Sequence, residues 1–520
     1  MDKKIILNSK KVFFVSTPLF YSNDVLHLGH CYSTLIADCL SKYKRAQGYK
    51  TFFITGLDEH GEKIFNSAIK NNLSLEKFLI KMSTKTKQLW KDLNVEYDYF
   101  HETKFNFHID LCQKILKILE FKNLIYKSFY IGKYCIYCAE FITKANLEND
   151  NKCPNCQREL SNLKEESFFW RIENYFSWIK NIYLKNKINI FPKFYKLEIE
   201  KNFFKENNLK NLAISRYKSK NLIPFLNYKN FYLYVWIDAL IGYLSSLKYQ
   251  INQKFFNLYW NNEVESLQII GKEIIRFHLI YWLLLLKQLN LPLPKNILIH
   301  GWIINNNIKM SKSKNNSINP YELIKIYDVD ALRYFLITCF QIKSDNNYSA
   351  KVINDYYNST LVNSFGNLIS RVFKMIIKYF DSKIINTDLE INNFNNDYLI
   401  KKCQATISKY VLFMDNYDCY HANLEVLELL KEANKLIEIK KPWAIENKNI
   451  LKQFLSSLFF VIIVSGFLFK PFFIKNIKIL FKATNFEIEK INFFKKFDLR
   501  LLKEIEIKKY LILFKRIKLG

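Results

Sequence analysis

The stretch STPLFYSNDVLHLGH, residues 16–30, joins an apolar run at Val12–Val15 to a helical pattern that begins near Leu28. The chain has only 11 glycines in 520 residues, and one of them, Gly29, stands between His27 and His30. An apolar run followed by such a turn and a helix predicts a buried strand that leads into a helix N-terminus. Free backbone N–H groups and the helix dipole favour an anion such as phosphate there, and flanking imidazoles can donate to its oxygens.

Three more apolar runs extend this pattern along the first half of the chain, at Thr51–Thr55, Leu267–Ile270 and Ile297–His300. Helical patterns follow all but the last, and such alternation predicts a parallel α/β sheet covered by helices on both faces. Ligands of these sheets bind beyond the carboxyl ends of the strands, where the histidines are expected.

From about Val352 onward the strand signals fade, and long helical patterns such as Tyr356–Tyr379 and Tyr398–Asp415 predict an all-α second half. The longest uncharged run, Gln453–Phe469, is shorter than the roughly 20 residues that a spanning helix needs. We therefore expect a buried bundle helix and a soluble protein without a membrane.

The net charge of +30 is consistent with RNA, DNA or a membrane surface as partner, but also with a biased composition rich in Lys, Asn, Ile and Phe. Charge alone therefore does not decide the function. Ten cysteines without a secretory signal predict a reducing, cytoplasmic location.

A second motif, Lys309-Met310-Ser311-Lys312-Ser313, follows the last predicted strand as a polar loop. Lysines on a loop suit the charge that develops on a triphosphate during displacement at phosphorus. Taken alone, this motif would be interpreted as an ordinary solvated loop, and His27 and His30 as two surface histidines around a turn glycine. The two motifs together favour phosphate chemistry.

The pair of motifs resembles the two signatures of class I aminoacyl-tRNA synthetases, which activate an amino acid with ATP on a nucleotide-binding fold. Four further segments are similar, in the same order, to the methionyl-tRNA synthetase family. They are TGLDEHGEK (55–63), YVWIDALIGYL (234–244), IIGKEIIRFHLIYW (269–282) and HGWIINNNIKMSKS (300–313). The resemblance covers roughly residues 12–445.

The resemblance implies that methionine and ATP, the latter with Mg²⁺, are substrates, and it assigns residues to each. The implied catalytic residues are His27, His30, Lys309 and Lys312, and the implied ATP-binding residues are His27, Gly29, His30, Gly271, Glu273 and Lys312. The implied methionine-binding residues are Leu19, Tyr21, Asp58, Trp236, Ala239, Leu240, Tyr243, Ile274 and His278. The family usually has Asp where this chain has Glu273.

These assignments are chemically reasonable, because a thioether favours polarizable aromatic walls and a carboxylate such as Asp58 can hold the substrate ammonium. Without the resemblance, Trp236 and Tyr243 would be interpreted as core residues. The expected reaction is attack of the methionine carboxylate on the α-phosphorus of ATP, followed by transfer to tRNA(Met), initiator and elongator. No protein nucleophile is required.

Two CxxC pairs, Cys135 with Cys138 and Cys153 with Cys156, predict a closed site of four thiolates for one structural Zn²⁺. Four unrelated core thiols are the alternative, but this spacing is improbable by accident. The family keeps such a knuckle in an insertion near the acceptor end of tRNA.

In the helical half, NLISR (367–371) and KKPWAIENK (440–448) resemble the anticodon-reading elements of the family. Asn367 and Arg371 share a helix face, and Trp443 follows a proline and is expected to start a helix with its ring free to stack on a base. A capping aromatic in the bundle is the alternative for Trp443.

The expected domains are a Rossmann catalytic domain in two parts (1–121 and 213–308), an insertion (122–212) with the zinc knuckle at 135–156, a loop and stem-contact region (309–350), an anticodon-binding bundle (351–490) and a C-terminal helical segment (491–520). We expect a monomer, because the chain stops soon after the bundle.

Other functions remain to be weighed. Class I synthetases for isoleucine, valine or leucine carry a large editing insertion, for which 122–212 has no room, and a cysteinyl enzyme would place zinc in its amino-acid pocket. An adenylyl-transferring enzyme would not need the helical half. A non-catalytic RNA-binding or assembly descendant is disfavoured by the intact His27, His30, Lys309 and Lys312.

Overall fold

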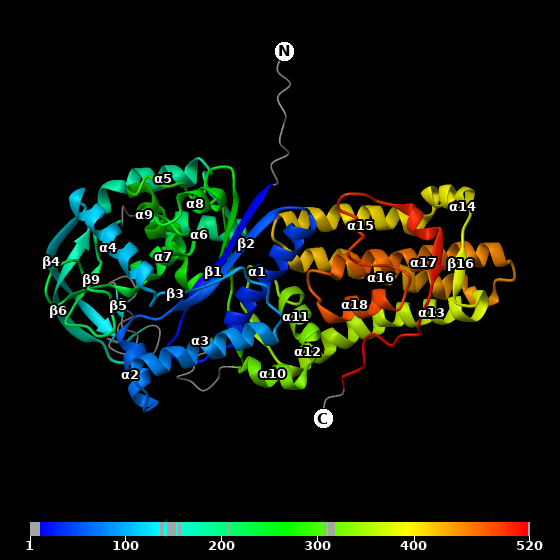
Figure 1. Ribbon diagram of the computed structural model, residues 1–520, viewed down its shortest axis with the longest axis horizontal. Helices are drawn as coiled ribbons and strands as arrows, with labels where there is room; N and C mark the ends of the chain where they lie inside the picture. Colours follow the sequence, from blue (N-terminus) through cyan, green and yellow to red (C-terminus); the bar gives the residue numbers. More distant parts are fainter. Residues whose placement is uncertain are drawn as a thin grey trace, which may run out of the picture.

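The structure, a computed structural model, describes residues 11–135, 140–142, 152–153, 158–204, 209–305, 308–309 and 318–517. Figure 1 shows a half built around a β-sheet and an elongated half built of helices, with helix α1 (Leu28–Ala46) between them. The predicted division into an α/β part and a helical part is confirmed.

A six-stranded parallel sheet forms the centre of the first half, in the order β3-β2-β1-β11-β12-β7. Its strands are β1 (Val12–Tyr21), β2 (Lys50–Asp58), β3 (Tyr99–Glu102), β7 (Asn189–Phe191), β11 (Glu265–Gly271) and β12 (Asn296–His300). Burial along β1, β2, β11 and β12 is nearly continuous, as expected for a parallel sheet covered on both faces. All four predicted strands are confirmed, and each strand is at least as long as the apolar run that predicted it.

Helices complete this half and cover the sheet (Figure 1). Besides α1 they are α2 (Glu62–Lys70), α3 (Leu75–Asp92), α4 (Asn106–Phe121), α5 (Phe176–Leu184), α6 (Lys193–Phe203), α7 (Val235–Ser246), α8 (Gln253–Tyr259) and α9 (Trp282–Gln288). A π-helical turn, Phe277–Tyr281, precedes α9.

The predicted insertion at 122–212 contains a separate antiparallel sheet in the order β5-β4-β6-β8. These strands are β4 (Ile125–Cys135), β5 (Glu140–Ile142), β6 (Ser161–Trp170) and β8 (Leu212–Ala213), followed by the pair β9 (Ser215–Tyr217) and β10 (Phe231–Leu233). One strand of the segment differs from the expectation, because β7 pairs with β12 and extends the catalytic sheet. The segment is therefore not wholly a separate insertion.

The helical half begins after β13 (Ile303–Asn305) and β14 (Ile308–Lys309), which form a small sheet with β15 (Asn346–Tyr348), a strand that follows the first two helices of this half. Its helices are α10 (Pro320–Ile326), α11 (Val329–Thr338), α12 (Ala350–Tyr357), α13 (Asn367–Phe380), α14 (Asp388–Asn393), α15 (Tyr398–Asp415), α16 (Cys419–Lys440), α17 (Lys448–Phe469) and α18 (Lys475–Lys482). Within the described residues, α17 alone is long and apolar enough to cross a membrane. Of its apolar 18-residue stretch, however, 83% is buried inside the protein. It is the core helix of the bundle.

The C-terminal segment differs from the expected helix. In its described part, to residue 517, a short 3₁₀ turn at Leu499–Leu502 is followed by β17 (Glu504–Glu506). β17 pairs antiparallel with β16 (Lys383–Ile385), which follows α13. Backbone pairing with a distant strand outweighs the local helical pattern here.

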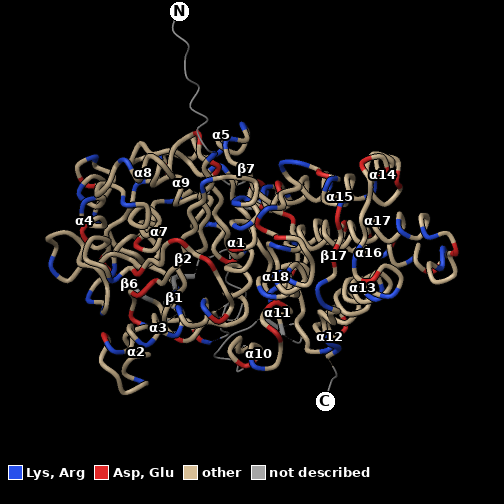
Figure 2. The backbone as a smooth tube through the Cα atoms, turned by 45° about the vertical axis from the view of Figure 1, so that its right-hand side comes forward, with Lys and Arg blue, Asp and Glu red and all other residues tan. Residues whose placement is uncertain are grey.

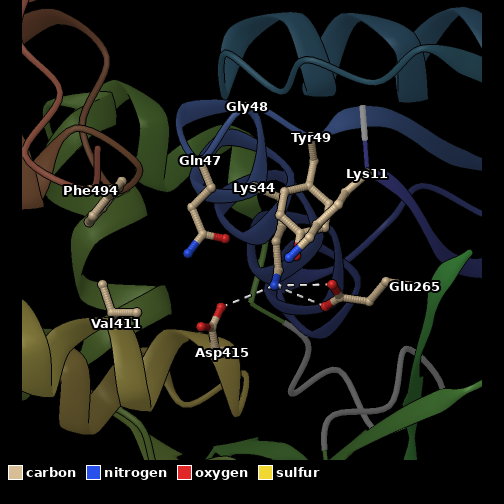
Figure 3. Close-up of a pocket in the computed structure, with 9 residues that line it drawn as sticks. All are labelled: Lys11, Lys44, Gln47, Gly48, Tyr49, Glu265, Val411, Asp415 and Phe494. Carbon is tan, nitrogen blue, oxygen red and sulfur yellow. Dashed lines mark hydrogen bonds and ion pairs between the residues drawn. The ribbon is translucent and has the colours of Figure 1, made fainter. Parts of the chain in front are cut away.

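A cavity of about 550 Å³ lies where the two halves meet, at the C-terminal end of α1. In Figure 3, Lys44 of α1 lies between two carboxylates, 2.9 Å from Glu265 at the start of β11 and 3.0 Å from Asp415 at the end of α15. Because Glu265 begins its strand, the cavity lies at the amino-terminal edge of the parallel sheet. The sequence motifs lie at the opposite edge.

Lysine and arginine residues are spread over both halves of the molecule (Figure 2). The positive charge therefore does not by itself single out one binding face.

Candidate active site

The order of the parallel sheet reverses between β1 and β11, because β2 and β3 lie on one side of β1 and β11 and β12 on the other. Such a switch point opens a crevice at the carboxyl ends of the two strands. The stretch 16–30 leaves β1 at this edge and starts α1, as predicted.

Two histidines form a reciprocal cap at the start of α1. Nδ1 of His27 accepts the Gly29 N–H at 3.1 Å, and Nδ1 of His30 accepts the His27 N–H at 3.0 Å. A Cβ at position 29 would lie 3.0 Å from the His27 ring, so glycine is what allows this ring to fold over the helix end. Because backbone N–H groups only donate, both neutral rings carry their proton on Nε2. Each ring is thus a directed donor beside the positive end of the helix dipole, which suits phosphate.

A further histidine, His300 at the end of β12, supports this helix start and was not predicted. Its Nδ1 donates to the Gly301 carbonyl at 2.8 Å, so its Nε2 accepts the Ser33 hydroxyl at 2.7 Å. Ser33 lies one turn after Gly29 on α1. Burial lowers the pKa of His300, which keeps the ring neutral. Its position as the last residue of a predicted strand was the available signal.

The predicted methionine-binding residues come from neighbouring elements of the same edge. Leu19 and Tyr21 lie on β1, and Tyr21 is the direct strand partner of Asp58 at the end of β2. The remaining residues lie on α7 (Trp236, Ala239, Leu240 and Tyr243) and on the turns after β11 (Ile274 and His278).

His278 and Tyr243 are joined by a hydrogen bond that determines the tautomer of the histidine. His278 Nδ1 donates to the Ile274 carbonyl at 3.0 Å, so its Nε2 accepts the Tyr243 hydroxyl at 2.8 Å. Burial lowers the pKa of His278 to about 4. The pair is therefore neutral, as a pocket for a thioether requires.

Beneath this pocket lies a buried network around Asp238, which was also not predicted. Its carboxylate contacts His60 Nδ1 at 2.8 Å and His108 Nε2 at 2.5 Å. Burial alone would raise the pKa of Asp238, but the two imidazoles hold it well below its ordinary value. Burial and then the charge of Asp238 raise the pKa of Asp58 well above its usual range. The nearby negative charge that raises the pKa of Asp58 also favours a cation such as a substrate ammonium beside it. Both Asp238 and His60 belong to the quoted segments, so the sequence carried this signal.

The side chains of His108, Cys112 and Asp238 bring three possible metal ligands within 4.8 Å of one another. His108 and Asp238 are already joined by a direct hydrogen bond, and His108 Nδ1 is 2.8 Å from the Ser245 hydroxyl. This cluster fits a hydrogen-bonded network rather than a cation site.

On the other side of the crevice, Glu273 follows β11 and its carboxylate lies over Gly271, where a Cβ would be 2.5 Å from Oε2. The indole N–H of Trp302 donates to this carboxylate at 2.7 Å. Of the two predicted loop lysines, Lys309 lies on β14, and Lys312 lies outside the described residues.

Two of the four predicted zinc ligands, Cys135 and Cys153, are described, and both are fully buried. Cys135 pairs with Glu140 across the hairpin β4–β5, and the Cys153 N–H donates to the Arg158 carbonyl at 2.8 Å. Each therefore takes part in a short antiparallel pairing of the backbone. Cys138 and Cys156 lie outside the described residues.

The three predicted anticodon-binding residues lie close together at one place on the bundle. The Arg371 guanidinium is 5.9 Å from the centre of the Trp443 ring, and Asn367 and Arg371 contact Asn434 and Glu438 of α16. Trp443 is 51% exposed. It lies in a 3₁₀ turn, Pro442–Ala444, and not at the start of an α-helix as expected, because α17 begins only at Lys448.

Comparison with known proteins agrees with this geometry. The family model described as tRNA synthetases class I (M) matches residues 13–164 and 159–373. The methionine–tRNA ligase of Mycoplasmopsis pulmonis is 37% identical, with 98% of this chain and 100% of that protein covered. That of Caldanaerobacter subterraneus subsp. tengcongensis is 36% identical over 98% of this chain and 79% of that protein.

Among solved structures, the Mycobacterium tuberculosis methionyl-tRNA synthetase in complex with methionyl-adenylate superimposes with a TM-score of 0.83. It is 25% identical, and the match covers 91% of this chain and 94% of that one. The chain belongs to the methionine–tRNA ligase family of class I tRNA synthetases.

Proposed function

We infer that the chain activates L-methionine with ATP and transfers the methionyl group to the 3′ end of tRNA(Met), with AMP and diphosphate as by-products. The observation that carries this is the histidine cap of α1 at the switch point, next to the pocket of Asp58, Tyr243 and His278. The relatives named above support the same reaction.

In the activation step, the methionine carboxylate attacks the α-phosphorus of ATP and diphosphate leaves. Asp58 holds the substrate ammonium, and Tyr243 and His278 line the thioether pocket. The Nε2–H groups of His27 and His30 donate to phosphate oxygens whose charge grows in the transition state. Lys309 and Lys312 are assigned the same task on the diphosphate. Positioning supplies most of the remaining acceleration, and a 2′- or 3′-hydroxyl of tRNA then takes the acyl group.

Zinc is proposed as a structural ion held by Cys135, Cys138, Cys153 and Cys156. Supporting it are the burial of Cys135 and Cys153, the backbone pairing at each of them and the thiolate chemistry of the set. When bound, the ion supplies folding energy to the hairpins of the insertion and takes no part in the reaction.

Further proposals concern the partners. Asn367, Arg371 and Trp443 are proposed to read the anticodon of initiator and elongator tRNA(Met), supported by their proximity and by the exposure of the Trp443 ring. We also propose a monomer in the cytoplasm.

The test is ATP–diphosphate exchange with methionine, compared with leucine, isoleucine and cysteine, followed by charging of tRNA(Met). Exchange is expected with methionine and with none of the other three amino acids. Exchange with another amino acid, or no exchange with methionine, would overturn the proposal. His30→Asn should slow exchange by about 10²- to 10³-fold, because a transition-state donor is lost. The matched control is His421→Asn on α16, where the histidine contacts Asp418 at the protein surface and should be dispensable.

A further inference from the structure

A cluster of four side chains from three separate segments lies beside Gly271. Lys272 and Glu273 follow β11, Trp302 follows β12, and Asp345 precedes β15. Lys272 Nζ is 2.7 Å from Asp345 Oδ2 and 3.9 Å from the centre of the Trp302 ring. The cluster is therefore held by an ion pair and a cation–π contact at the same time.

Trp302 is fixed from several directions by this cluster. Its backbone N–H donates to Asp345 Oδ1 at 2.8 Å, and its carbonyl accepts the Asn346 N–H at 2.8 Å. Lys272 covers one ring face. With the ring held in this way, the indole N–H points to Glu273 Oε2 at 2.7 Å. A hydrogen bond from a fixed indole gives the carboxylate a defined position.

The carboxylate of Glu273 lies at the carboxyl edge of the sheet, at the end of β11. It lies over Gly271 at the end of β11, and its charge raises the pKa of His300 against the larger opposing effect of burial. His300 in turn accepts the hydroxyl of Ser33, one turn from Gly29 in the histidine cap. Glu273 is thus on the same edge of the sheet as the capped end of α1.

We propose, on the basis of the proposed function, that Trp302 is a positioning residue that holds the Glu273 carboxylate to receive the ribose hydroxyls of ATP. A carboxylate oxygen accepts more than one hydrogen bond, so the bond to the indole orients the group and leaves it able to bind hydroxyls. Glu273 is a long, exposed side chain, and its bond to the indole restricts the positions that the carboxylate takes before the nucleotide binds. A carboxylate that is positioned in advance binds the nucleotide at a lower entropic cost.

The test uses Trp302→Phe, which keeps an aromatic ring over Lys272 but removes the indole N–H. Methionine-dependent exchange is measured with ATP and with 2′-deoxy-ATP. The KM for ATP should rise about 3- to 10-fold with kcat changed less than about 2-fold, as the loss of one hydrogen bond used in binding predicts. The preference for ATP over 2′-deoxy-ATP should fall by a similar factor. Loss of a general packing contact would instead raise the KM for both nucleotides by the same factor and leave the preference between them unchanged.

The matched control is Trp260→Phe, which removes an indole hydrogen bond to the Pro292 carbonyl at 3.0 Å, outside the crevice. It should leave the nucleotide preference unchanged. In a Glu273→Ala background, Trp302→Phe should have no further effect on that preference, because its action passes through the carboxylate.

Three outcomes would overturn the inference alone: an unchanged preference in Trp302→Phe, an unchanged preference in Glu273→Ala, or an undiminished effect of Trp302→Phe in the Glu273→Ala background. Absence of methionine-dependent exchange in the unmodified chain would instead overturn the proposed function. If Trp302→Phe does not fold, Asp345→Asn, which weakens the ion pair to Lys272 and so loosens the indole, provides the same comparison.

Discussion

Replacing Asp38 by Asn in the middle of α1 should strongly destabilise the protein. The Asp38 carboxylate is 2.6 Å from Arg333 Nη2 of α11 and 2.6 Å from Lys42 Nζ, and it accepts the Glu96 N–H at 2.8 Å. The side chains of Asp38 and Arg333 are both 0% exposed. This ion pair joins the helix that carries the histidine cap to the first helices after the catalytic sheet.

The substitution preserves size and removes the only carboxylate that Arg333 contacts within the described residues. Arg333 keeps hydrogen bonds to the carbonyls of Leu93 and Phe472, but these do not neutralise a buried guanidinium. Breaking a buried pair by removing one partner typically costs about 3–5 kcal/mol. We expect this loss in the free energy of unfolding, measured by urea denaturation and followed by circular dichroism.

The pH dependence of the loss follows from the pKa of Asp38. Burial alone would raise this pKa, but Arg333 and Lys42 hold it below its ordinary value. A lowered pKa in the folded state stabilises the protein fully above the unfolded value of about 3.9, and this contribution disappears as the pH falls further. The difference between Asp38→Asn and the unmodified chain should therefore be constant near neutral pH and shrink in acid.

The control is Asp388→Asn, which breaks an exposed pair with Lys503 whose side chains are 83% and 62% exposed. That change should cost less than about 1 kcal/mol. If Asp38→Asn costs no more than Asp388→Asn, or if its cost disappears in high salt as an exposed pair's would, the reasoning from burial is refuted.

Three other predictions concern the function. Trp443→Ala should raise the KM for tRNA by about 5- to 150-fold through loss of base stacking, while methionine-dependent exchange without tRNA stays near normal. If Trp443→Ala leaves tRNA charging unchanged, or lowers methionine-dependent exchange as much as charging, Trp443 is a packing residue. Freshly reduced protein should contain one zinc ion per chain, lost in Cys153→Ser, with charging affected more than exchange. Metal analysis that finds no zinc in the unmodified chain would contradict this. Finally, the KM for methionine should rise as the pH is lowered, because the pKa of Asp58 is raised by burial and by Asp238 and a protonated Asp58 cannot pair with the substrate ammonium. Asp58→Asn should flatten this profile, and an equal slope in both proteins would exclude Asp58 as the cause.

The sequence by itself determined the features that depend on neighbouring residues. The four buried strands follow from short apolar runs, and the placement of His27, Gly29 and His30 at a helix start follows from the strand, turn and helix pattern of one continuous stretch. The proximity of Asn367 and Arg371 follows from the helical period. These are local properties, so their patterns can be read along the chain.

Only the tertiary structure decided the contacts between distant segments. β7 joins the catalytic sheet from within the expected insertion, and β17 replaces an expected helix because it finds β16 as a partner. The bonds of His300 to Ser33 and of Trp302 to Glu273 join different elements, as does the ion pair of Asp38 with Arg333. A single side chain that gains a partner on another element of the fold leaves no period or spacing in the sequence. Its role is set by the packing of whole elements, which bury it and leave one neighbour within reach.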